Sequence, residues 1–561
     1  MMADGLSFDV IVVGGGTAGC VLASRLSERP GLTVALIEAG RDYGPEGEPE
    51  AVLDSYSRAA AHQAFLWPGL RARLHDGAPR VAPFAQARLL GGGSAVMGMQ
   101  ALRGLPQDYD EWAAAGATGW SWSDVQPFFR RIERDCDYRP DEHGDDGPLP
   151  VWRRPPEAWP GFTAAVAEAL QARGHRLGSD LNAESADGLY PMPTVGLPTR
   201  RITSAAAYLG ASVRARRNLT ILPGTKVERV IFDGTRAVGV CANGPAGSVT
   251  LLAREVVISA GAIQSPALLL RSGIGPADDL SRIGVPLVAN RPGVGANLLN
   301  HPMFTVGFHL RRKARQSAAL RPHIHSLLRF SSQDPDCPPG DMYLSILNRT
   351  APHRLGQAIG AISLSVYKSY SHGSVRLRSA EVAEEPAIEL GLLSDERDRR
   401  RMVDGIVMML DLLRDPRIAA AAPLPFVPSS SRMTQWLARP SAAGSVFAAL
   451  LGGLADGSDV LARRIFSLAG DPVPATDDRD AILAIARDRT RPMYHLAGSA
   501  RMGAVGDPRT VVDPCCRVVG VHGLRVADAS IMPTLPRANT FLPVTMIAER
   551  AATLFCTDLR S

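Results

Sequence analysis

The chain opens with two short apolar runs separated by a stretch with helical spacing. Residues 10–13 are four consecutive β-branched side chains, which is typical of a strand buried in a parallel sheet. Residues 20–26 carry apolar side chains at helical spacing, and residues 33–37 form a second apolar run that ends at Glu38. This order predicts a strand, a helix and a second strand at the start of the chain.

The turn between the first strand and the helix has the spacing of a dinucleotide-binding motif. Gly14, Gly16 and Gly19 follow a GxGxxG pattern, in which glycine permits a tight turn, a close approach to a pyrophosphate and close packing of helix on strand. The pyrophosphate would bind the free N–H groups at the positive end of the helix. Glu38 lies about 20 residues further on, where a carboxylate accepts hydrogen bonds from a ribose. No Arg directly follows Glu38, which disfavours a 2′-phosphate. An ordinary βα turn is the alternative interpretation.

The next segment has a less regular pattern. Residues 42–83 show no clean period and are expected to lie over the ligand. Residues 88–96 contain three consecutive glycines, whose N–H groups can approach a flat ring or a phosphate closely. Residues 102–112 are expected to start a helix, and residues 162–173 to form an amphipathic one.

The middle of the chain predicts further strands. Residues 227–232 and 237–240 flank an Asp-Gly turn and predict a hairpin. Residues 255–261 predict a buried strand that leads into a helix over 265–270, which places Rossmann-type pieces at both ends of a discontinuous nucleotide-binding domain. Residues 359–367 alternate, and this predicts a sheet with one packed face and one face toward a ligand.

One later segment, residues 442–455, is strongly apolar. It is shorter than the roughly 20 residues that a membrane-spanning helix needs. A core helix or an oligomer contact is the first interpretation, and a lid or an interfacial helix is the second.

Composition limits the class of protein. A chain of 561 residues is too long for one hydrophobic core, so two large domains are expected. The net charge of +5 comes without a basic run, which argues against a nucleic-acid partner. No signal peptide or transmembrane segment is expected. The seven cysteines are scattered without a CxxC pair, which favours reduced thiols in the cytoplasm.

Two stretches near the C-terminus carry the candidate chemistry. His495 stands among small residues, and Asn539 stands shortly before a proline that fixes the turn. His323 and His325 form an HxH pair without a third ligand, so no metal site is expected.

Three longer motifs carry a family resemblance. They are residues 261–275, residues 291–298 followed by His301, and residues 526–530. With them the chain resembles the glucose-methanol-choline (GMC) oxidoreductases over almost its whole length. Within this family, the sequence of several stretches is most similar to the bacterial hydroxymethylfurfural-oxidase-like branch, which oxidises aromatic and allylic primary alcohols.

The resemblance implies an α/β fold (α+β overall). A Rossmann-type FAD-binding domain is expected beside a substrate-binding domain built on an antiparallel sheet with flanking helices. We assign residues 1–153, 199–300 and 490–561 to the first domain, and residues 154–198 and 301–489 to the second.

The resemblance also assigns site residues. The family's catalytic pair falls on His495 and Asn539. Ser363, Ser365 and Tyr367, with His495, fall on the side that faces the substrate. The expected cofactor-binding residues are Gly14, Gly16, Thr17, Ala18, Gly19, Glu38, Ala39, Arg88, Gly92, Gly93, Ser94, Met97, Gly98, Val227, Ala260, Gly261, Asp528, Ala529, Asn539 and Thr540.

One position departs from the family pattern. The residue that usually stands beside the isoalloxazine is Asn or His, whereas this chain has Met97. A hydrogen bond to the flavin is therefore expected to be lost or supplied by another group. The position of covalent attachment in some members falls on Val96, so the FAD is expected to be non-covalent.

These residues suit alcohol oxidation. An imidazole titrates near working pH and can take the hydroxyl proton while hydride leaves the α-carbon for flavin N5. A nearby amide can hold the alcohol oxygen. The substrate is then expected to be a primary aryl or allylic alcohol. Oxygen, a quinone or a carrier protein would accept the electrons, and the oligomeric state is open.

Three other functions stay open from the sequence. The first is an FAD-containing hydroxynitrile lyase of the same family. The second is a nicotinamide-only dehydrogenase, which would leave the C-terminal pair unexplained. The third is a non-catalytic flavoprotein that binds its ligand without converting it.

Overall fold

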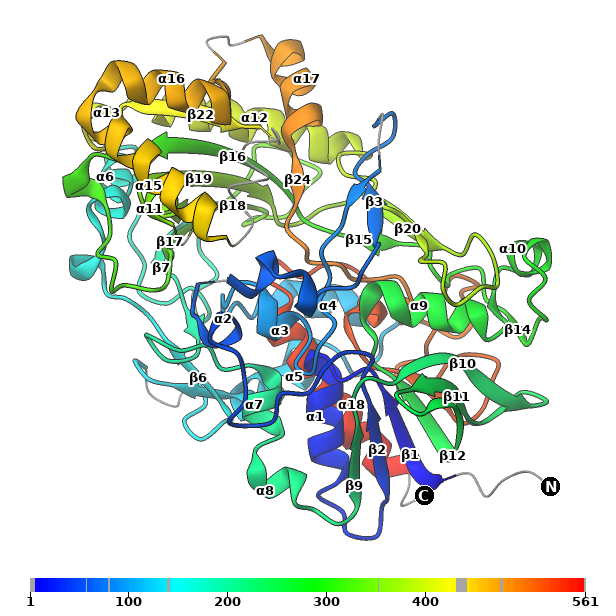
Figure 1. Cartoon of the computed structure of the whole chain (residues 1–561). Helices are drawn as coiled ribbons and strands as arrows, with labels where there is room; N and C mark the ends of the chain where they lie inside the picture. The colour runs from blue at the N-terminus through cyan, green and yellow to red at the C-terminus, as the bar shows by residue number, and fades with distance from the viewer. Residues whose placement is uncertain are drawn as a thin grey trace.

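A sheet built around the first strand forms one end of the molecule (Figure 1). The computed structural model describes residues 6–56, 58–78, 81–138, 142–351, 353–429, 441–474 and 478–558. The sheet has seven strands, and β12 pairs with β25 outside the main path. In spatial order the strands are β10 (Lys226–Asp233), β11 (Arg236–Gly244), β12 (Gly247–Ile258), β1 (Ser7–Val13), β2 (Val34–Ile37) and β9 (Leu219–Leu222), with β25 (Leu524–Val526) beside β12.

The central strands of this sheet are parallel, as the apolar runs predict. β1 pairs in parallel with β12 and β2, and β2 pairs in parallel with β9. The predicted hairpin is confirmed as β10 and β11, which pair antiparallel. The helix after the glycine-rich turn is α1 (Thr17–Leu26), and the helix after β12 is α9 (Gly261–Arg271).

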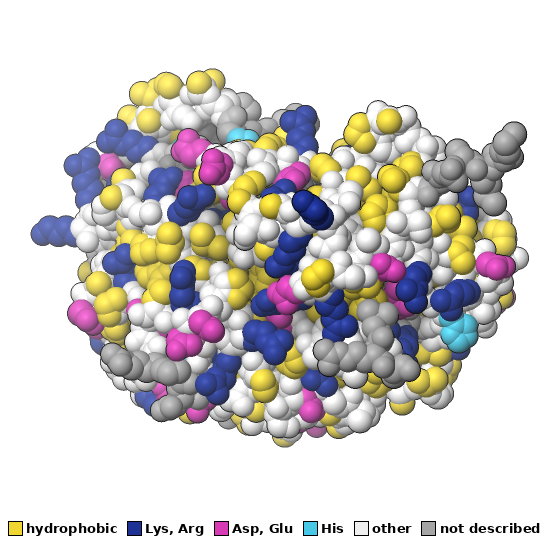
Figure 2. All heavy atoms as spheres, turned by 90° about the horizontal axis from the view of Figure 1, so that it is seen from below, with side chains coloured by type: hydrophobic (Ala, Val, Ile, Leu, Met, Phe, Trp, Pro, Cys, Tyr) yellow, Lys and Arg dark blue, Asp and Glu magenta, His cyan; other side chains and the backbone are white. Residues whose placement is uncertain are grey.

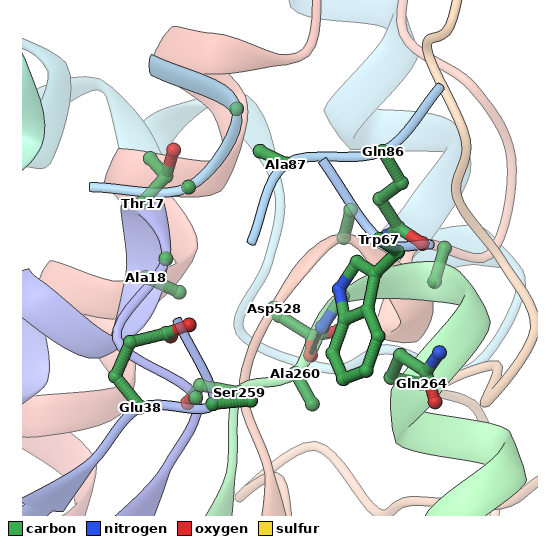
Figure 3. Close-up of a pocket in the computed structure, with 18 of the residues that line it drawn as sticks. Thr17, Ala18, Glu38, Trp67, Gln86, Ala87, Ser259, Ala260, Gln264 and Asp528 are labelled. Carbon is green, nitrogen blue, oxygen red and sulfur yellow. Dashed lines mark hydrogen bonds between the residues drawn. The ribbon is translucent and has the colours of Figure 1, made fainter. Parts of the chain in front are cut away.

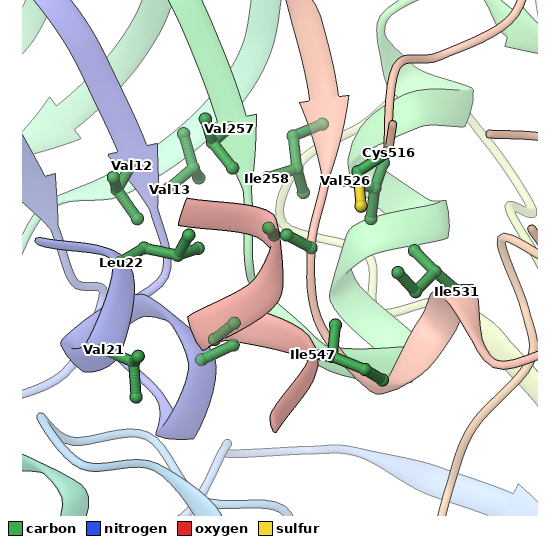
Figure 4. Close-up of a cluster of buried hydrophobic side chains, with 14 of the residues drawn as sticks. Val12, Val13, Val21, Leu22, Val257, Ile258, Cys516, Val526, Ile531 and Ile547 are labelled. Atoms are coloured by element: carbon green, nitrogen blue, oxygen red, sulfur yellow. The ribbon is translucent and has the colours of Figure 1, made fainter. Parts of the chain in front are cut away.

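The C-terminal helix joins the two ends of the chain. Helix α18 (Phe541–Asp558) lies against α1 and α5 (Trp122–Ile132), and its buried side chains belong to the same hydrophobic core as those of β1, β12 and β25. Figure 4 shows the shared core, in which Val12 and Val13, Val257 and Ile258, and Ile547 meet from different segments. Residues 539 and 540 directly precede α18, so this packing carries them to the end of β1 where the glycine-rich turn begins.

An antiparallel sheet forms the other large part of the molecule (Figure 1). In spatial order its strands are β23 (Gly470–Pro472), β22 (Leu424–Pro428), β16 (Pro302–His309), β19 (Ile359–Val366), β18 (Met342–Leu347), β17 (Ile324–Phe330) and β7 (Gly188–Pro191), with β24 (Arg491–Pro492) beside β16. Helices α6 (Gly161–Gln171), α12 (Glu396–Leu412) and α17 (Arg479–Arg489) cover one face. Ile362, Leu364 and Val366 of β19 point into that core. The alternating residues of β19 therefore point away from it, toward the nucleotide-binding side.

Smaller sheets connect these two parts. One contains β15 (Leu298–Leu299), β20 (His372–Arg376), β21 (Ala387–Glu389), β3 (Arg71–Arg73) and β4 (Ala82–Pro83). The division into two discontinuous domains remains our proposal. It rests on the two large sheets and their separate hydrophobic clusters. The short β24 pairs with β16, although its residues were assigned to the nucleotide-binding domain.

The helix expected from residue 102 begins later, as α4 (Pro106–Ala114). Gly104 has a φ of 90°, which turns the chain out of a helical path. Pro106 is suited to the first turn of a helix, and the Asp108 carboxylate accepts the Leu105 N–H at 2.9 Å. The start of the helix is therefore set by local capping and not by the apolar period.

Residues 442–455 do form a helix, α15 (Ala442–Gly457), but only one side of it is buried. The interpretation of this segment as a core helix is therefore wrong for the opposite side of α15, where large apolar side chains are exposed. Within the described part of the chain, no helix is long and apolar enough to cross a membrane. On the face shown in Figure 2, basic and acidic side chains are scattered among apolar ones without one continuous charged area.

Candidate active site

The glycine-rich turn after β1 is a tight backbone crevice. Gly14 has a φ of 100°, and a Cβ on it would lie 2.6 Å from the carbonyl oxygen of Ser259. A Cβ on Gly19 would lie 1.8 Å from the carbonyl oxygen of Gly14, so this glycine lets α1 pack directly on the turn. The second glycine-rich loop meets the first, since a Cβ on Gly92 would lie 2.7 Å from the Cα of Gly16. The two loops together leave backbone N–H groups without side chains in front of them.

Glu38 stands at the end of β2, beside this crevice. Its carboxylate accepts the N–H of Gly15 at 2.8 Å and the N–H of Gly40 at 2.6 Å. Burial raises the pKa of Glu38, and the two backbone hydrogen bonds oppose that shift. The side chain lines the cavity, as a ribose-binding carboxylate must.

A large cavity extends from this crevice. The space that its walls surround is about 1260 Å³, a volume that includes the solvent at its open mouth. Figure 3 shows Glu38, Thr17 and Ala18 on one side of it and Trp67 and Gln86 on the other. Expected cofactor residues that line the cavity are Gly14, Gly16, Thr17, Ala18, Glu38, Ala39, Gly92, Gly93, Met97, Val227, Ala260, Gly261, Asp528 and Ala529.

The other expected cofactor residues do not belong to the cavity lining. They are Gly19, Arg88, Ser94, Gly98, Asn539 and Thr540. Arg88 donates to the carbonyl oxygen of Ala39 at 3.2 Å and lies 4.9 Å from the centre of the Trp67 ring. Ser94 donates to Gly91 at 2.6 Å and accepts from the N–H of Ser204, so it holds the second glycine loop in place.

Several lining residues carry no signal in the sequence. Trp67 comes from the aperiodic segment that was expected to lie over the ligand, and Phe84 directly follows that segment. Lys226 precedes the expected Val227, and its Nζ lies 5.4 Å from the centre of the Trp67 ring. Gln264 follows the expected Gly261 by less than one helical turn. Only the folded structure shows that these residues line the same cavity.

His495 and Asn539 lie in contact beside this cavity. The Asn539 Nδ2 is 3.1 Å from the His495 Nε2. His495 is buried, and its flanking residues Tyr494 and Leu496 line the cavity. Tyr494 has a φ of 63°, which is rare for a bulky residue and points to a functional turn.

Two further residues complete the contact. His301, which directly precedes β16, has its Nδ1 2.9 Å from the Nδ1 of His495. Tyr367, at the end of β19, donates from Oη to the Asn539 Oδ1 at 2.9 Å. The rings of His301 and Tyr367 stack with their centres 4.5 Å apart. The sequence named His301 only as part of a motif and gave it no role, although that motif was the available signal.

The hydrogen bonds fix which nitrogen of His495 is free to accept a proton. An amide oxygen only accepts and an amide nitrogen only donates. Because Tyr367 donates to Oδ1 of Asn539, the amide presents its N–H to Nε2 of His495. Nε2 therefore accepts, and the proton of His495 lies on Nδ1, where it is donated to His301.

Burial keeps both rings neutral. It lowers the pKa of His495 from 6.5 to about 4. It also lowers the pKa of His301 well below 6.5, and the neighbouring His495 adds to the shift. A neutral His495 is unprotonated at Nε2, as a general base needs; this lone pair accepts the Asn539 N–H here and becomes available when an alcohol oxygen takes over that N–H.

The two expected serines lie on the same face of β19 as Tyr367. Ser363 shares a hydrogen bond with the hydroxyl of Thr305 at 2.9 Å, and Ser365 is buried. The structure thus brings Tyr367 to the catalytic pair directly, whereas Ser363 lies in a second hydroxyl pair further along the strand.

The neighbouring residues Val96 and Met97 lie in different environments, Val96 in an apolar cluster and Met97 in the wall of the cavity. Val96 is fully buried in a small apolar cluster, and its hydrocarbon side chain offers no group for covalent attachment. Met97, at the end of α3 (Gly93–Val96), lines the cavity and cannot donate a hydrogen bond to a ligand there.

The buried His143 lies outside this site. His143 Nε2 is 2.5 Å from Asp180, and its Nδ1 is 3.1 Å from Glu133 and from Asp135. Burial alone would lower the pKa of His143. The hydrogen bonds to these carboxylates have the larger combined effect and raise the pKa to about 10. Arg103 pairs with Glu133 as well. Because these cations already neutralise the carboxylates, we assign no metal ion to this cluster.

Comparisons with known proteins identify the relatives of this chain. The GMC oxidoreductase models match residues 8–303 and residues 369–548. The chain is 38% identical to the 5-(hydroxymethyl)furfural oxidase of Methylovorus sp. (strain MP688), over 98% of this chain and 99% of that one. It is 31% identical to the glucose dehydrogenase [FAD, quinone] of Drosophila melanogaster, over 98% and 86%. Among solved structures, pyridoxine 4-oxidase from Mesorbium loti superposes with a TM-score of 0.80 at 28% identity, over 98% and 99%.

Proposed function

Because the chain belongs to the GMC oxidoreductase family and is an FAD-dependent alcohol oxidase or dehydrogenase, we propose that it oxidises a primary aryl or allylic alcohol to the aldehyde. We assign His495 as the base that takes the hydroxyl proton. The contact between His495 and Asn539 beside the cavity carries this proposal. The relatives reported above are oxidases and dehydrogenases, so a hydroxynitrile lyase is not favoured.

The cavity fits FAD. The backbone crevice at Gly14 and Gly16 leaves N–H groups at the N-terminus of α1 for a pyrophosphate, and Glu38 is placed for a ribose. When bound, FAD supplies the acceptor for the hydride of the alcohol. We propose that it is held without a covalent bond, because the side chain of Val96 is inert.

The protein's part in the reaction is to move one proton and to hold one oxygen. An alcohol hydroxyl that reaches Nε2 of His495 can donate its proton there and accept the N–H of Asn539. Both groups then act on the same oxygen atom. The amide supports the developing negative charge without competing for the proton.

We further assign Tyr367 and His301 as positioning residues. Tyr367 orients the amide of Asn539, and His301 accepts the Nδ1 proton of His495. If the amide turned over, its oxygen would face Nε2 and favour the tautomer that is already protonated there. The base would then be blocked.

The proposed substrate class rests on the relatives and on the face of β19 that carries Ser363 and Ser365. Two relatives are named for oxidising hydroxymethylfurfural and pyridoxine, which are ring-bearing primary alcohols. Ser363 and Ser365 are small and alternate with the core residues of β19, and we propose that their face of the strand borders the substrate. We propose oxygen as the first electron acceptor to test and a quinone as the second, since relatives of both kinds match. The scattered thiols suit the cytoplasm, which we keep as a proposed location.

The experiment is anaerobic reduction of the purified yellow protein by a panel of alcohols. Hydroxymethylfurfural, pyridoxine and benzyl alcohol should bleach the flavin absorbance, and glucose should bleach it far more slowly. Admitting air or adding a quinone then identifies the acceptor by the return of the colour. His495→Ala should bind FAD and fail to bleach. A colourless protein, or bleaching at the same rate in His495→Ala, would refute the proposal.

A further inference from the structure

Helix α15 has the opposite arrangement from an ordinary surface helix, because its small residues face the protein and its large apolar residues face the solvent. Its buried residues are small, and it packs on α11 (Arg354–Gln357) and, with α16 (Asp459–Ala469), on a separate apolar cluster near β22. The buried residues of α15 recur at helical spacing and are Gly444, Ala448, Gly452 and Ala455. Glycine and alanine there let the helix lie close to the protein.

The large apolar side chains point outward instead. Val446 and Leu450 are each 62% exposed, and Leu454 is 51% exposed. Their spacing of four residues puts them on one face of α15, opposite the buried stripe. Val460 at 63% and Leu461 at 38% continue the surface on α16. We call these five side chains the outward apolar patch. A monomer rarely leaves such a patch in water, so the patch indicates a binding surface.

Basic side chains stand within the patch. Arg464 is four residues after Val460 and three after Leu461, so it lies beside both on the surface of α16. Arg463 is three residues after Val460 and is also exposed. The long stem of an arginine can lie along apolar side chains while its guanidinium reaches a polar layer.

The acidic residues at the corner between the two helices are already neutralised. Asp456 pairs with Arg315 and is buried, and Asp459 pairs with Arg311 at 2.8 Å. Arg312 stands at the same corner with its side chain 75% exposed. The patch and its edge therefore carry a surplus of positive charge.

We propose that the outward apolar patch docks onto the surface of a membrane that contains anionic lipids. Aliphatic side chains would enter the interfacial layer, and the arginines would meet the lipid phosphates. A second copy of the chain is a poorer fit, because a two-fold contact would bring together two copies of the same positively charged surface. The patch lies beside the eight-stranded sheet, away from β1, β2 and β9 (Figure 1), so docking leaves the nucleotide-binding end free.

The test is flotation of the full-length FAD-loaded protein with vesicles. One set contains phosphatidylcholine alone, and the other contains phosphatidylcholine with phosphatidylglycerol. We expect binding to the anionic set only, weakened by added salt. Leu454→Asp should abolish binding. Replacing Arg463 and Arg464 by Ser should weaken it roughly 25-fold, since each basic residue contributes about five-fold.

Leu287→Asp is the matched control, because Leu287 is also 51% exposed but lies outside the patch. It should bind vesicles as the wild type does, and both aspartate variants should keep the wild-type rate of alcohol oxidation. The proposal is wrong if the wild type fails to bind anionic vesicles, or binds neutral ones equally. It is also wrong if Leu454→Asp instead abolishes a concentration-dependent dimer measured by light scattering.

Discussion

Replacing Tyr367 by Phe tests whether the orientation of Asn539 controls the base. The substitution removes one hydroxyl and keeps the ring, which stacks on Tyr343 at 3.9 Å and on His301 at 4.5 Å. The lost contact is the 2.9 Å hydrogen bond from Oη to the Asn539 Oδ1. Burial raises the pKa of Tyr367 well above its ordinary value, so the hydroxyl is a proton donor at every working pH.

The expected effect follows from the value of one neutral hydrogen bond. Such a bond contributes about 0.5–1.5 kcal/mol, so its loss lets the amide turn over in part of the molecules. In that fraction the tautomer of His495 with a proton on Nε2 is favoured, and it cannot accept the alcohol proton. We expect the rate of flavin reduction to fall roughly 2- to 13-fold. Substrate binding should change less than the rate.

The assay is stopped-flow reduction of the flavin by substrate without oxygen. Tyr343→Phe is the control, because Tyr343 also donates one buried hydrogen bond, to the carbonyl oxygen of Arg537 at 2.7 Å. It belongs to the same aromatic stack but does not touch Asn539 in any hydrogen bond of the described residues. A wild-type rate in Tyr367→Phe, or an equal loss in both variants, would refute the reasoning.

The remaining predictions concern the base, the cofactor and pH. His495→Ala should lower the rate of flavin reduction about 10²- to 10⁴-fold, measured in the same assay, and a smaller loss would mean that another group takes the proton. Gly19→Ala should lower both FAD content and Tm, since its Cβ would lie 1.8 Å from the Gly14 carbonyl oxygen; unchanged absorbance per protein would contradict this. Acid precipitation should release free yellow flavin into the supernatant, because Val96 offers no attachment; colour retained in the pellet would show a covalent bond. His495 and His301 are held neutral by burial, so their contribution to stability is complete above pH 6.5 and is lost as the pH falls toward 4. Thermal unfolding from pH 7 to 4 should show this decline, and it should be smaller in His495→Asn.

The sequence predicts those features of the fold and the site that depend only on residues close together in the chain. The spacing of Gly14, Gly16 and Gly19 and the position of Glu38 follow from the conformational needs of one turn and one strand end, and the structure forms that crevice. The start of α4 was misplaced because a capping interaction, not the apolar period, determines it.

The catalytic contact depends on distant residues. His495 and His301 are 194 residues apart, and no local period relates them. The family resemblance supplied His495 and Asn539, but it supplied no role for His301. Trp67 belongs to a segment without a period, so its place in the cavity could not be derived from spacing. The positions of these residues depend on how the two large sheets and α18 pack against one another. The local pattern of apolar and polar residues carries no information about that packing.

The position of these residues suggests why the base is sensitive to the whole fold. Tyr367 directly follows β19, and His301 directly precedes β16. Asn539 lies two residues before α18, whose buried side chains belong to the hydrophobic core of the nucleotide-binding sheet. The hydrogen bond between Tyr367 and Asn539 therefore spans the two parts of the molecule. A small shift of one sheet against the other would lengthen this bond before it disturbed either core. It follows that substitutions between the sheets should change the rate of flavin reduction before they change thermal stability, and a variant set measured for both quantities checks that order.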